Sequence, residues 1–336
     1  MRCNILVTGA SGFIGSFLVE EALKLNFKVW AGVRSTSSKK YLTDKRIHFI
    51  NLNFQNPTEL RSQIAGFKST HCKWDYVIHC AGVTKCKNKA EFDQHNYEAT
   101  KNLVEVLTEF NMIPRQFIYI STLSVYGPIR ENNYEPIAEE DTPLPNTAYG
   151  KSKLKTEHYL KSLPDFPYVI FRPTGVYGPR EKDYFLMAQS IKKHVDFSVY
   201  LKRQNLTFIY VKDLVKAIFL AIGKKVVRKS YFVSDGKVYS SNDFSNYIRK
   251  ELGNPFVISF KIPLFILKTV SLCAEFCSAC INKTSTLNSD KYNIMKQRNW
   301  QCDITPLVNE LEFQPDYSLE QGVKETIDWY KKEGWL

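Results

Sequence analysis

Apolar and polar positions follow two alternating patterns through the first half of the chain. Short apolar runs such as 5–8 (ILVT) are typical of strands in a parallel sheet, and the longer amphipathic stretches between them are typical of helices. The predicted strands are 3–8, 28–33, 47–51, 75–80, 116–121 and 167–172. The predicted helices are 12–25, 57–66, 88–110 and 147–163. This alternation predicts an α/β fold in which helices cover both faces of a parallel sheet.

The pattern becomes irregular after about residue 173. Stretches with helical periodicity follow at 183–194, 212–222, 241–252 and 261–281, and short strands are predicted at 208–211 and 231–234. We therefore predict a first domain over residues 1–173. A smaller, mainly substrate-binding domain is predicted over residues 174–336, with some of its elements returning to the sheet.

The spacing of glycines after the first predicted strand indicates a phosphate-binding turn. The run 9–15 (GASGFIG) joins that strand to the first predicted helix. Gly9 permits a tight turn, Gly12 lets the backbone approach the phosphates, and Gly15 lets the helix pack on the strand. The N-terminus of the helix offers N–H groups to the anion. This predicts a doubly wound, Rossmann-like domain, in which the cofactor contacts from this turn are Gly9, Ser11, Gly12, Phe13, Ile14 and Gly15.

A second motif carries chemistry. Tyr149 and Lys153 are four residues apart in a predicted helix and therefore share one face. A tyrosine has an ordinary pKa of about 10, and a neighbouring ammonium group is expected to lower it. Such a tyrosine exchanges a proton with an alcohol while hydride moves at the adjacent carbon. A surface helix on which the two residues are merely neighbours is the alternative, and the glycine turn argues against it.

With these motifs the chain resembles the extended short-chain dehydrogenases/reductases, which include the NAD(P)-dependent epimerases and dehydratases. The resemblance runs nearly from end to end. The further segments that carry it are 78–82 (IHCAG), 96–100 (NYEAT), 120–127 (ISTLSVYG), 172–179 (RPTGVYGP), 210–213 (YVKD), 311–315 (LEFQP) and 318–322 (SLEQG). These segments are highly specific for the superfamily, but they are much less specific for the reaction that a member catalyses.

The resemblance also implies roles for individual residues. Thr122 would orient the substrate oxygen beside Tyr149, and Lys153 would also hold the nicotinamide ribose, with Ser124 a weaker candidate. The further cofactor-binding residues that it implies are Asn53 and Phe54 at the adenine, Cys80, Ala81, Gly82 and Ser121, and Pro173 to Val176 at the nicotinamide.

The end of the second predicted strand bears on the choice of cofactor. NAD-binding members carry an acid there for the ribose hydroxyls, whereas a basic residue accommodates the 2′-phosphate of NADP. Here Val33 occupies that place and Arg34 follows, and a guanidinium is well matched to phosphate. We therefore predict NADP, with NAD as the alternative.

Two departures from the family pattern bear on the reaction. Leu123 and Ser124 stand where dehydratases carry an Asp-Glu pair, which argues against dehydration. Gly175 and Leu206 stand where nucleotide-sugar epimerases carry Asn and Arg to hold a diphosphate, and losing a bidentate cation weakens such binding. The cations that could replace the arginine are Arg180, Lys202 and Arg203.

These departures favour an NADP-dependent oxidoreductase that interconverts a secondary alcohol and a ketone, with Tyr149 as acid/base. By resemblance it lies nearer the 3β-hydroxysteroid dehydrogenases and the dihydroflavonol-reductase-like enzymes, and its substrate is expected to be an apolar ring compound. The alternatives are a nucleotide-sugar 4-epimerase and a non-catalytic NADP-binding regulatory protein. The intact set of Thr122, Tyr149 and Lys153 argues against the second alternative.

The composition is that of an ordinary globular protein, with 44% hydrophobic and 24% charged residues. The net charge of +12 suits a phosphorylated cofactor, an acidic substrate or an anionic surface, although a solvated basic exterior is the simpler interpretation. The sequence carries no signal-peptide pattern, and its eight cysteines do not suggest a disulfide scaffold, so we expect a cytoplasmic protein. It shows no nucleic-acid-binding motif, so we expect no nucleic-acid partner.

Segment 261–281 is the most apolar part of the second predicted domain. Lys261, Lys268 and Glu275 interrupt it, so no run is long enough to span a bilayer. We expect a core helix under the substrate pocket, and a helix lying on a membrane surface is the alternative. Its cysteines share one helical face and are expected to be buried thiols rather than metal ligands, because no fourth ligand lies nearby; they are Cys273, Cys277 and Cys280.

Helices 88–110 and 147–163 carry apolar residues on more than one face. In similar enzymes the corresponding helices pair with their copies across a two-fold axis, so we expect a homodimer. The apolar residues on which this expectation rests are Leu103, Val106, Leu107, Leu154 and Leu160.

Overall fold

The computed structural model describes residues 2–199, 203–280, 285 and 287–336. The chain forms two compact units. The first unit comprises Met1–Thr122, Ala148–Arg172 and Ile218–Tyr231, and the second unit comprises Leu123–Thr147, Pro173–Ala217 and Phe232–Leu336. The division of roles at residue 173, with cofactor binding before it and substrate binding after it, stays a prediction.

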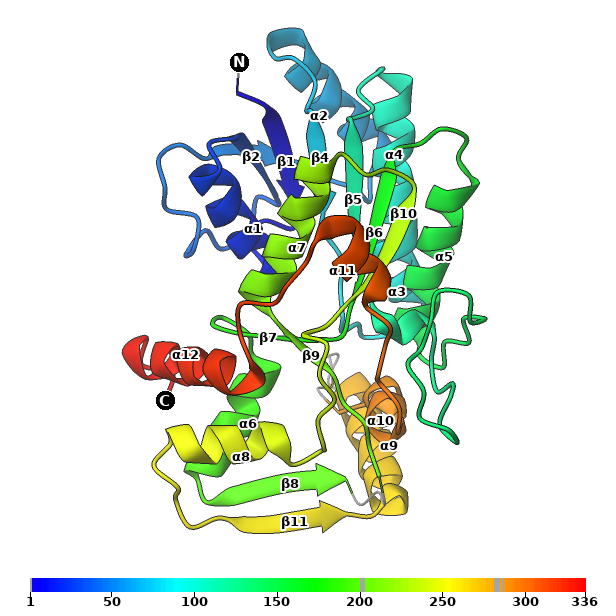
Figure 1. The fold of residues 1–336 in the computed structure, drawn as a ribbon. Coiled ribbons are helices and arrows are strands. Elements are labelled where there is room, and N and C mark those ends of the chain that lie inside the picture. Colours follow the sequence, from blue (N-terminus) through cyan, green and yellow to red (C-terminus); the bar gives the residue numbers. More distant parts are fainter. Residues whose placement is uncertain (1, 200–202, 281–284, 286) are drawn as a thin grey trace. The chain divides into compact units, whose positions relative to one another are not determined.

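The first unit is built on a seven-stranded sheet with the order β10-β6-β5-β4-β1-β2-β3 (Figure 1). The strands are β1 (Asn4–Thr8), β2 (Lys28–Val33), β3 (His48–Asn51), β4 (Tyr76–His79), β5 (Gln116–Ile120), β6 (Tyr168–Pro173) and β10 (Lys229–Val233). The strand order reverses between β1 and β4, and in such sheets ligands bind beyond the carboxyl ends of the strands at this point. The predicted α/β, Rossmann-like fold is confirmed.

Helices cover both faces of this sheet (Figure 1). They are α1 (Phe13–Lys24), α2 (Pro57–Thr70), α3 (Ala90–Phe92), the π-helix η1 (Asp93–Glu98), α4 (Ala99–Glu109) and α5 (Ala148–Ser162). Leu6 of β1 and Val77 of β4 are buried in one cluster with Leu60 of α2, Leu103 of α4 and Leu160 of α5. Successive side chains of β1 alternate between faces, and α1 contacts β1 and β2.

Two predicted helices differ from the observed ones. Helix α2 continues past Gly66 to Thr70, because Phe67 packs against Trp74 with ring centres 4.1 Å apart. The predicted helix 88–110 begins at Ala90 and contains the six-residue π-helix η1.

His79 joins three elements of the first unit at the end of β4. Its Nδ1 lies 2.9 Å from Thr8 Oγ1 of β1, and its Nε2 lies 3.0 Å from Thr100 Oγ1 of α4. Burial lowers the pKa of His79 to about 3, so the ring is neutral and its role is structural.

The second unit combines two small sheets with several helices. Strand β7 (Gly175–Tyr177) pairs with β9 (Phe208–Tyr210), and β8 (Val195–Val199) pairs with β11 (Ile258–Ile262). The helices are α6 (Asp183–Lys192), α8 (Asp243–Glu251), α9 (Leu264–Cys280), α10 (Ser289–Lys296), α11 (Thr305–Leu311), α12 (Leu319–Lys332), and the 3₁₀-helix η2 (Leu123–Val125). Helix α7 (Val211–Lys224) begins in the second unit and ends in the first.

The closing segment 318–322 has a structural role in the second unit. Ser318 caps α12, and its side chain accepts from the Gln321 N–H. A Cβ on Gly322 would lie only 2.3 Å from the Tyr177 hydroxyl oxygen, so α12 approaches β7 as closely as it does because residue 322 is glycine.

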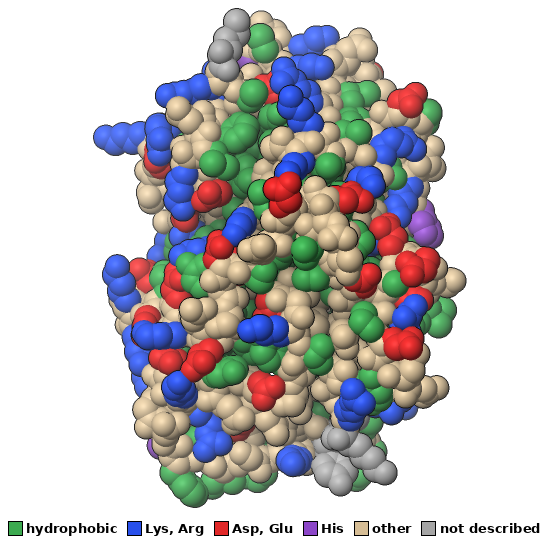
Figure 2. Space-filling view, in the orientation of Figure 1, with side chains coloured by type: hydrophobic (Ala, Val, Ile, Leu, Met, Phe, Trp, Pro, Cys, Tyr) green, Lys and Arg blue, Asp and Glu red, His purple; other side chains and the backbone are tan. Residues whose placement is uncertain are grey.

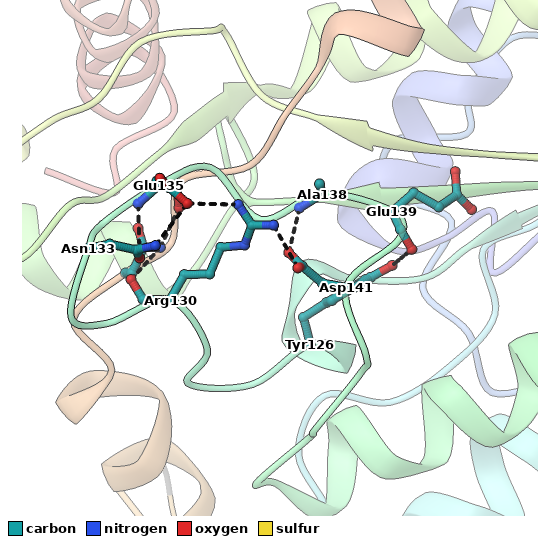
Figure 3. A network of polar contacts seen from close by, with 8 residues as sticks. Tyr126, Arg130, Asn133, Glu135, Ala138, Glu139 and Asp141 are labelled. Carbon is teal, nitrogen blue, oxygen red and sulfur yellow. Dashed lines mark hydrogen bonds and ion pairs between the residues drawn. The ribbon is translucent and has the colours of Figure 1, made fainter.

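A network around Arg130 holds the segment that follows η2 in the second unit (Figure 3). Arg130 Nη2 donates to Asp141 Oδ1 at 2.7 Å, Nη1 lies 3.4 Å from Glu135 Oε2, and the Ala138 N–H donates to Asp141 Oδ2 at 2.9 Å. Burial is the largest single effect and opposes ionisation of Asp141, but the hydrogen bonds from Arg130 and the Ala138 N–H and the charge of Arg130 together outweigh it, so the pKa of Asp141 is lowered. The segment is therefore fixed by ionic contacts rather than by regular structure.

The prediction of a core helix at 261–281 is wrong. Lys261 and Ile262 belong to β11, the helix begins at Leu264, and Ile281 lies outside the described residues. Phe265 and Phe276 are 72% and 71% exposed. Cys273 and Cys277 are exposed as well, so the expectation of buried thiols is wrong for both. The side chain of Cys280 is not among those that the structure describes.

Across the described residues, no helix is both long and apolar enough to cross a membrane.

Candidate active site

The glycine turn lies between β1 and α1, at the point where the strand order reverses. Gly9 has a φ of +64°, and a Cβ there would lie 2.8 Å from the Ala81 backbone nitrogen beyond β4. A Cβ on Gly15 would lie 2.1 Å from the Gly9 carbonyl oxygen, so the first turn of α1 packs directly on the loop. Gly12 is exposed and caps α1 without a side chain. Backbone N–H groups at this end of α1 fit the pyrophosphate of a dinucleotide.

Tyr149 lies in the first turn of α5, and its phenol makes a hydrogen bond with the Thr122 side chain. Burial raises the pKa of Tyr149, the nearby Cys80 raises it further, and the bond with Thr122 lowers it in part. The predicted lowering of this pKa by Lys153 is wrong, because loss of water around the phenolate outweighs the opposing effects. The phenol is therefore protonated at neutral pH.

Lys153 follows one helical turn after Tyr149 and is 5% exposed. Its Nζ donates a 2.8 Å hydrogen bond to the Ile120 carbonyl and lies 4.6 Å from the centre of the Tyr119 ring. Burial lowers the pKa of Lys153 to about 8, although Cys80 and Glu157 oppose the shift. The ammonium is thus held at the carboxyl end of β5, and it loses its proton at a lower pH than an ordinary lysine does.

The loop after β4 is tied to α5 by Asn96, to which the sequence analysis gave no role. The Val83 N–H donates to Asn96 Oδ1 at 2.8 Å, and Asn96 Nδ2 lies 3.0 Å from Ser152 Oγ. Asn96 is fully buried in the π-helix η1, a type of helix that is frequent at functional sites. A Cβ on Gly82 would lie 2.9 Å from Asn96 Oδ1 and 3.4 Å from Lys153 Nζ, which places Gly82 beside the lysine.

A buried ion pair supports the same helix and was also missed. Arg172 of β6 lies 2.7 Å from Glu157 of α5, and Ser121 donates to the same carboxylate at 2.5 Å. Glu157 is four residues after Lys153 and raises its pKa. The spacing of Tyr149, Lys153 and Glu157 places all three on one face of α5, which was the available signal.

The remaining cofactor candidates of the first unit occupy several places. Arg34 is exposed at the end of β2, where its backbone N–H donates to Ser37 Oγ. Asn53 Nδ2 donates to Glu59 Oε2 at 2.7 Å, and the Phe54 ring lies 5.6 Å from the His79 ring. Ser11, Phe13, Ile14, Cys80 and Ala81 are half-buried. Their roles at the cofactor stay predictions.

Pro173 and Val176 belong to the second unit, in β6 and β7. Their predicted role at the nicotinamide stays a prediction too.

The two positions that depart from the epimerase pattern lie in the second unit. A Cβ on Gly175 would lie 2.7 Å from the Tyr184 hydroxyl oxygen and 3.1 Å from the Phe208 ring, so aromatic side chains fill the space that an asparagine would need. Leu206 pairs with Tyr239 through two backbone hydrogen bonds of 2.8 Å. The Arg203 guanidinium lies 4.1 Å from the centre of the Tyr134 ring.

Two other cations could replace the epimerase arginine. Arg180 is half-buried after β7, and Lys202 lies outside the described residues. The second unit also has a polar hollow of about 430 Å³, with Arg203 and Lys261 in its wall.

The helices expected at a dimer interface are α3, η1, α4 and α5. Leu103, Val106, Leu107 and Leu160 are buried within the first unit itself, and Leu154 is half-buried. The homodimer stays a prediction, and these four buried leucine and valine side chains do not supply its interface.

Comparison with known proteins gives three findings. The sequence profile of the NAD dependent epimerase/dehydratase family matches residues 5–233. The "Uncharacterized UDP-glucose epimerase YtcB" of Bacillus subtilis is 27% identical, with 96% of each chain covered. The "Sterol-4-alpha-carboxylate 3-dehydrogenase, decarboxylating" of Dictyostelium discoideum is 26% identical, with 86% of this chain and 93% of the relative covered.

Solved structures share the fold. A UDP-glucose 4-epimerase from Thermotoga maritima, solved with UDP-glucose, has a TM-score of 0.78 at 21% identity and covers 98% of this chain and 99% of its own. A dTDP-glucose 4,6-dehydratase from Bacillus anthracis, in complex with NAD, has the same TM-score at 20% identity and covers 99% of this chain and 98% of its own.

Proposed function

Because the chain belongs to the NAD-dependent epimerase/dehydratase family, we propose that it oxidises and reduces the carbon of a secondary alcohol, with Tyr149 moving the alcohol proton. The observation that carries this proposal is the Tyr149 phenol hydrogen-bonded to Thr122, with the Lys153 ammonium one turn further along the same helix. A bound nicotinamide would supply the hydride acceptor or donor. The glycine turn, with its exposed Gly12 at the start of α1, would hold its pyrophosphate.

The protein's own residues have distinct parts in this proposal. The raised pKa of Tyr149 keeps the phenol protonated, ready to donate its proton to a ketone oxygen. Thr122 orients the same oxygen through its hydroxyl. Lys153, one helical turn further along α5, would hold the nicotinamide ribose. Asn96, Glu157 and Arg172 position these groups through the loop after β4 and through α5.

For the substrate we propose a nucleotide-linked sugar, epimerised at one carbon while the cofactor stays bound. The names of the relatives favour this reaction over the apolar alcohol that the sequence analysis preferred. The polar hollow of the second unit supports it, because its volume is that of a ligand site and Arg203 and Lys261 suit an anionic diphosphate. Dehydration is not proposed, since Leu123 and Ser124 provide no acid or base.

A second candidate is net oxidoreduction of an apolar secondary alcohol. The specific observation in its favour is the space beside Gly175, which Tyr184 and Phe208 fill where an epimerase carries asparagine. The sterol dehydrogenase relative supports it as well.

For the cofactor we propose NADP in preference to NAD, on the exposed Arg34 after β2. The solved neighbour in complex with NAD makes NAD the alternative.

Calorimetry separates the two substrate classes. UDP-glucose should bind with a micromolar dissociation constant, and Arg203→Met should weaken it about tenfold or more, as expected for a lost charge-assisted contact. Arg228→Met, which removes an exposed arginine of the first unit, is the matched control. If sugar nucleotides fail to bind while a ring alcohol reduces NADP⁺, the second candidate replaces the first.

A further inference from the structure

We propose that the second unit docks on an anionic phospholipid surface through an exposed apolar face, formed by the β8–β11 ribbon and helix α9. The sequence analysis gave a helix on a membrane surface as the alternative for segment 261–281, and the ribbon was not expected. The inference does not depend on which reaction the first unit supports.

The ribbon presents its apolar side to solvent. The parallel register places Phe197 beside Phe260 and Val195 beside Ile258, and the rings of Phe197 and Phe260 stack with centres 5.7 Å apart. Phe197, Ile258 and Phe260 are 55%, 50% and 48% exposed. The other side of β8 carries Asp196, which is buried. Hydrophobic side chains gather at the edge of the second unit where β8 and β11 lie (Figures 1 and 2).

Helix α9 follows the ribbon directly in the chain, since it begins two residues after β11 ends. Its buried side is narrow and holds Leu267 and Ser271, which are 3% and 0% exposed. Ser271 is fully buried and its hydroxyl donates to the Leu267 carbonyl, whereas Phe265, Leu272 and Phe276 are 72%, 50% and 71% exposed. Exposed apolar side chains gathered in this number mark an interaction site.

The charges on the face identify the occupant as anionic. Within segments 192–199 and 254–278, all of which are described, the exposed charged side chains other than histidine are lysines: Lys192, Lys193, Lys261 and Lys268. Lys261 alternates with Phe260 and lies on the Asp196 side of the ribbon, so the cations next to the apolar residues are Lys268 of α9 and the two lysines that precede β8. Of the two acidic residues in these segments, Asp196 is buried, and Glu275 is half-buried and accepts from the Ser289 N–H. Apolar side chains bordered by lysines suit the boundary between acyl chains and acidic headgroups.

A lipid surface fits this face better than a second copy of the chain. Two copies meeting here would bring their lysines together, whereas the cores of protein interfaces are depleted in lysine. Helix α9 has 17 residues, and Lys268 and Glu275 interrupt it, so it suits a position in the plane of the interface rather than across it.

Flotation with phospholipid vesicles tests the apolar part. The full chain should float with vesicles of phosphatidylcholine and phosphatidylglycerol, and much less with phosphatidylcholine alone. The double substitution Phe260→Ser and Phe265→Ser should abolish flotation without changing thermal stability, because both side chains are exposed. Leu144→Ser removes a 64% exposed side chain elsewhere in the second unit and should have no effect.

Charge reversal tests the basic part. Lys268→Glu should weaken vesicle binding by roughly fivefold or more, from the contribution of one basic residue near an anionic surface. Lys45→Glu, an exposed lysine of the first unit, should leave it unchanged. Absence of flotation, equal binding to neutral vesicles, or a dimer that the phenylalanine substitutions dissociate would each overturn the proposal.

Discussion

The Arg172 guanidinium lies 2.7 Å from the Glu157 carboxylate, where the two side chains are only 2% and 1% exposed. The pair joins β6 to α5 one turn beyond Lys153, and Ser121 donates to the same carboxylate. Removing two charges from water is costly, so such a pair tolerates the loss of one partner poorly.

Arg172→Met should lower the free energy of unfolding by about 3–5 kcal/mol, because it leaves the Glu157 carboxylate buried and unpaired. Urea denaturation measures the change. Arg61→Met is the control, since the Arg61–Glu109 pair is about half exposed, and it should cost less than about 1 kcal/mol. If Arg172→Met does not fold, Glu157→Gln gives a milder test in the same direction. Equal effects of Arg172→Met and Arg61→Met would show that the buried pair is not important for stability.

Gly15→Ala should destabilise the first unit by about 1–3 kcal/mol, the usual cost of forcing extra atoms into a packed site. The added Cβ would lie 2.1 Å from the Gly9 carbonyl oxygen. Gly66→Ala provides a matched substitution, because nothing lies within 4 Å of the added carbon in α2, and it should stabilise by about 0.5–1 kcal/mol. Thermal unfolding of both variants measures these effects, and a stable Gly15→Ala variant that binds cofactor normally would contradict the geometry of the turn.

The lowered pKa of Lys153 predicts a specific dependence of stability on pH. Below about pH 8 the amine is protonated in both states, and its burial destabilises the folded protein. Between about 8 and the ordinary value of 10.5 the unfolded chain binds one more proton, so stability rises with pH. Relative to Lys153→Met, the native protein should gain about 1.4 kcal/mol per pH unit in this range. Parallel curves for the two proteins would rule out the shift.

NADPH should bind more tightly than NADH, and Arg34→Ala should remove most of the preference, about 1.5–3 kcal/mol for hydrogen bonds to a charged group. Fluorescence titration of both reduced cofactors measures it. Arg46→Ala serves as the comparison, because Arg46 lies in the same loop region but is paired with Asp44 at 2.7 Å. Equal affinities of the unmodified protein for the two cofactors would refute NADP as the preferred cofactor.

Much of the first unit could be predicted because its strands and helices each carry one strong periodicity. Strands β1, β4 and β5 are continuous apolar runs, and the glycine turn has a fixed spacing. The helix positions of Tyr149 and Lys153 follow from the same reasoning. The raised pKa of Tyr149 could not be predicted from the sequence, because it depends on how completely the fold removes water from the phenol.

The second unit was harder to predict for a physical reason. Strands β8 and β11 are short and keep Phe197 and Phe260 exposed, so burial does not impose the usual alternation. Most of the large apolar side chains of α9 face solvent although Leu267 is buried, which is the reverse of what a core helix requires. Glu157 was missed because a carboxylate on a helix is ordinarily solvated, and only β6 brings Arg172 to it.

Single-turnover kinetics with Tyr149→Phe tests whether Tyr149 moves the alcohol proton. The nicotinamide absorbance of the cofactor-loaded protein is followed after mixing with the substrate that calorimetry and turnover select. Tyr149→Phe should slow the change in absorbance at least about a hundredfold, the usual contribution of a positioned acid or base, while the cofactor dissociation constant stays the same. A Tyr149→Phe variant that reacts at nearly the normal rate would show that another group moves the proton, and would contradict the proposed site.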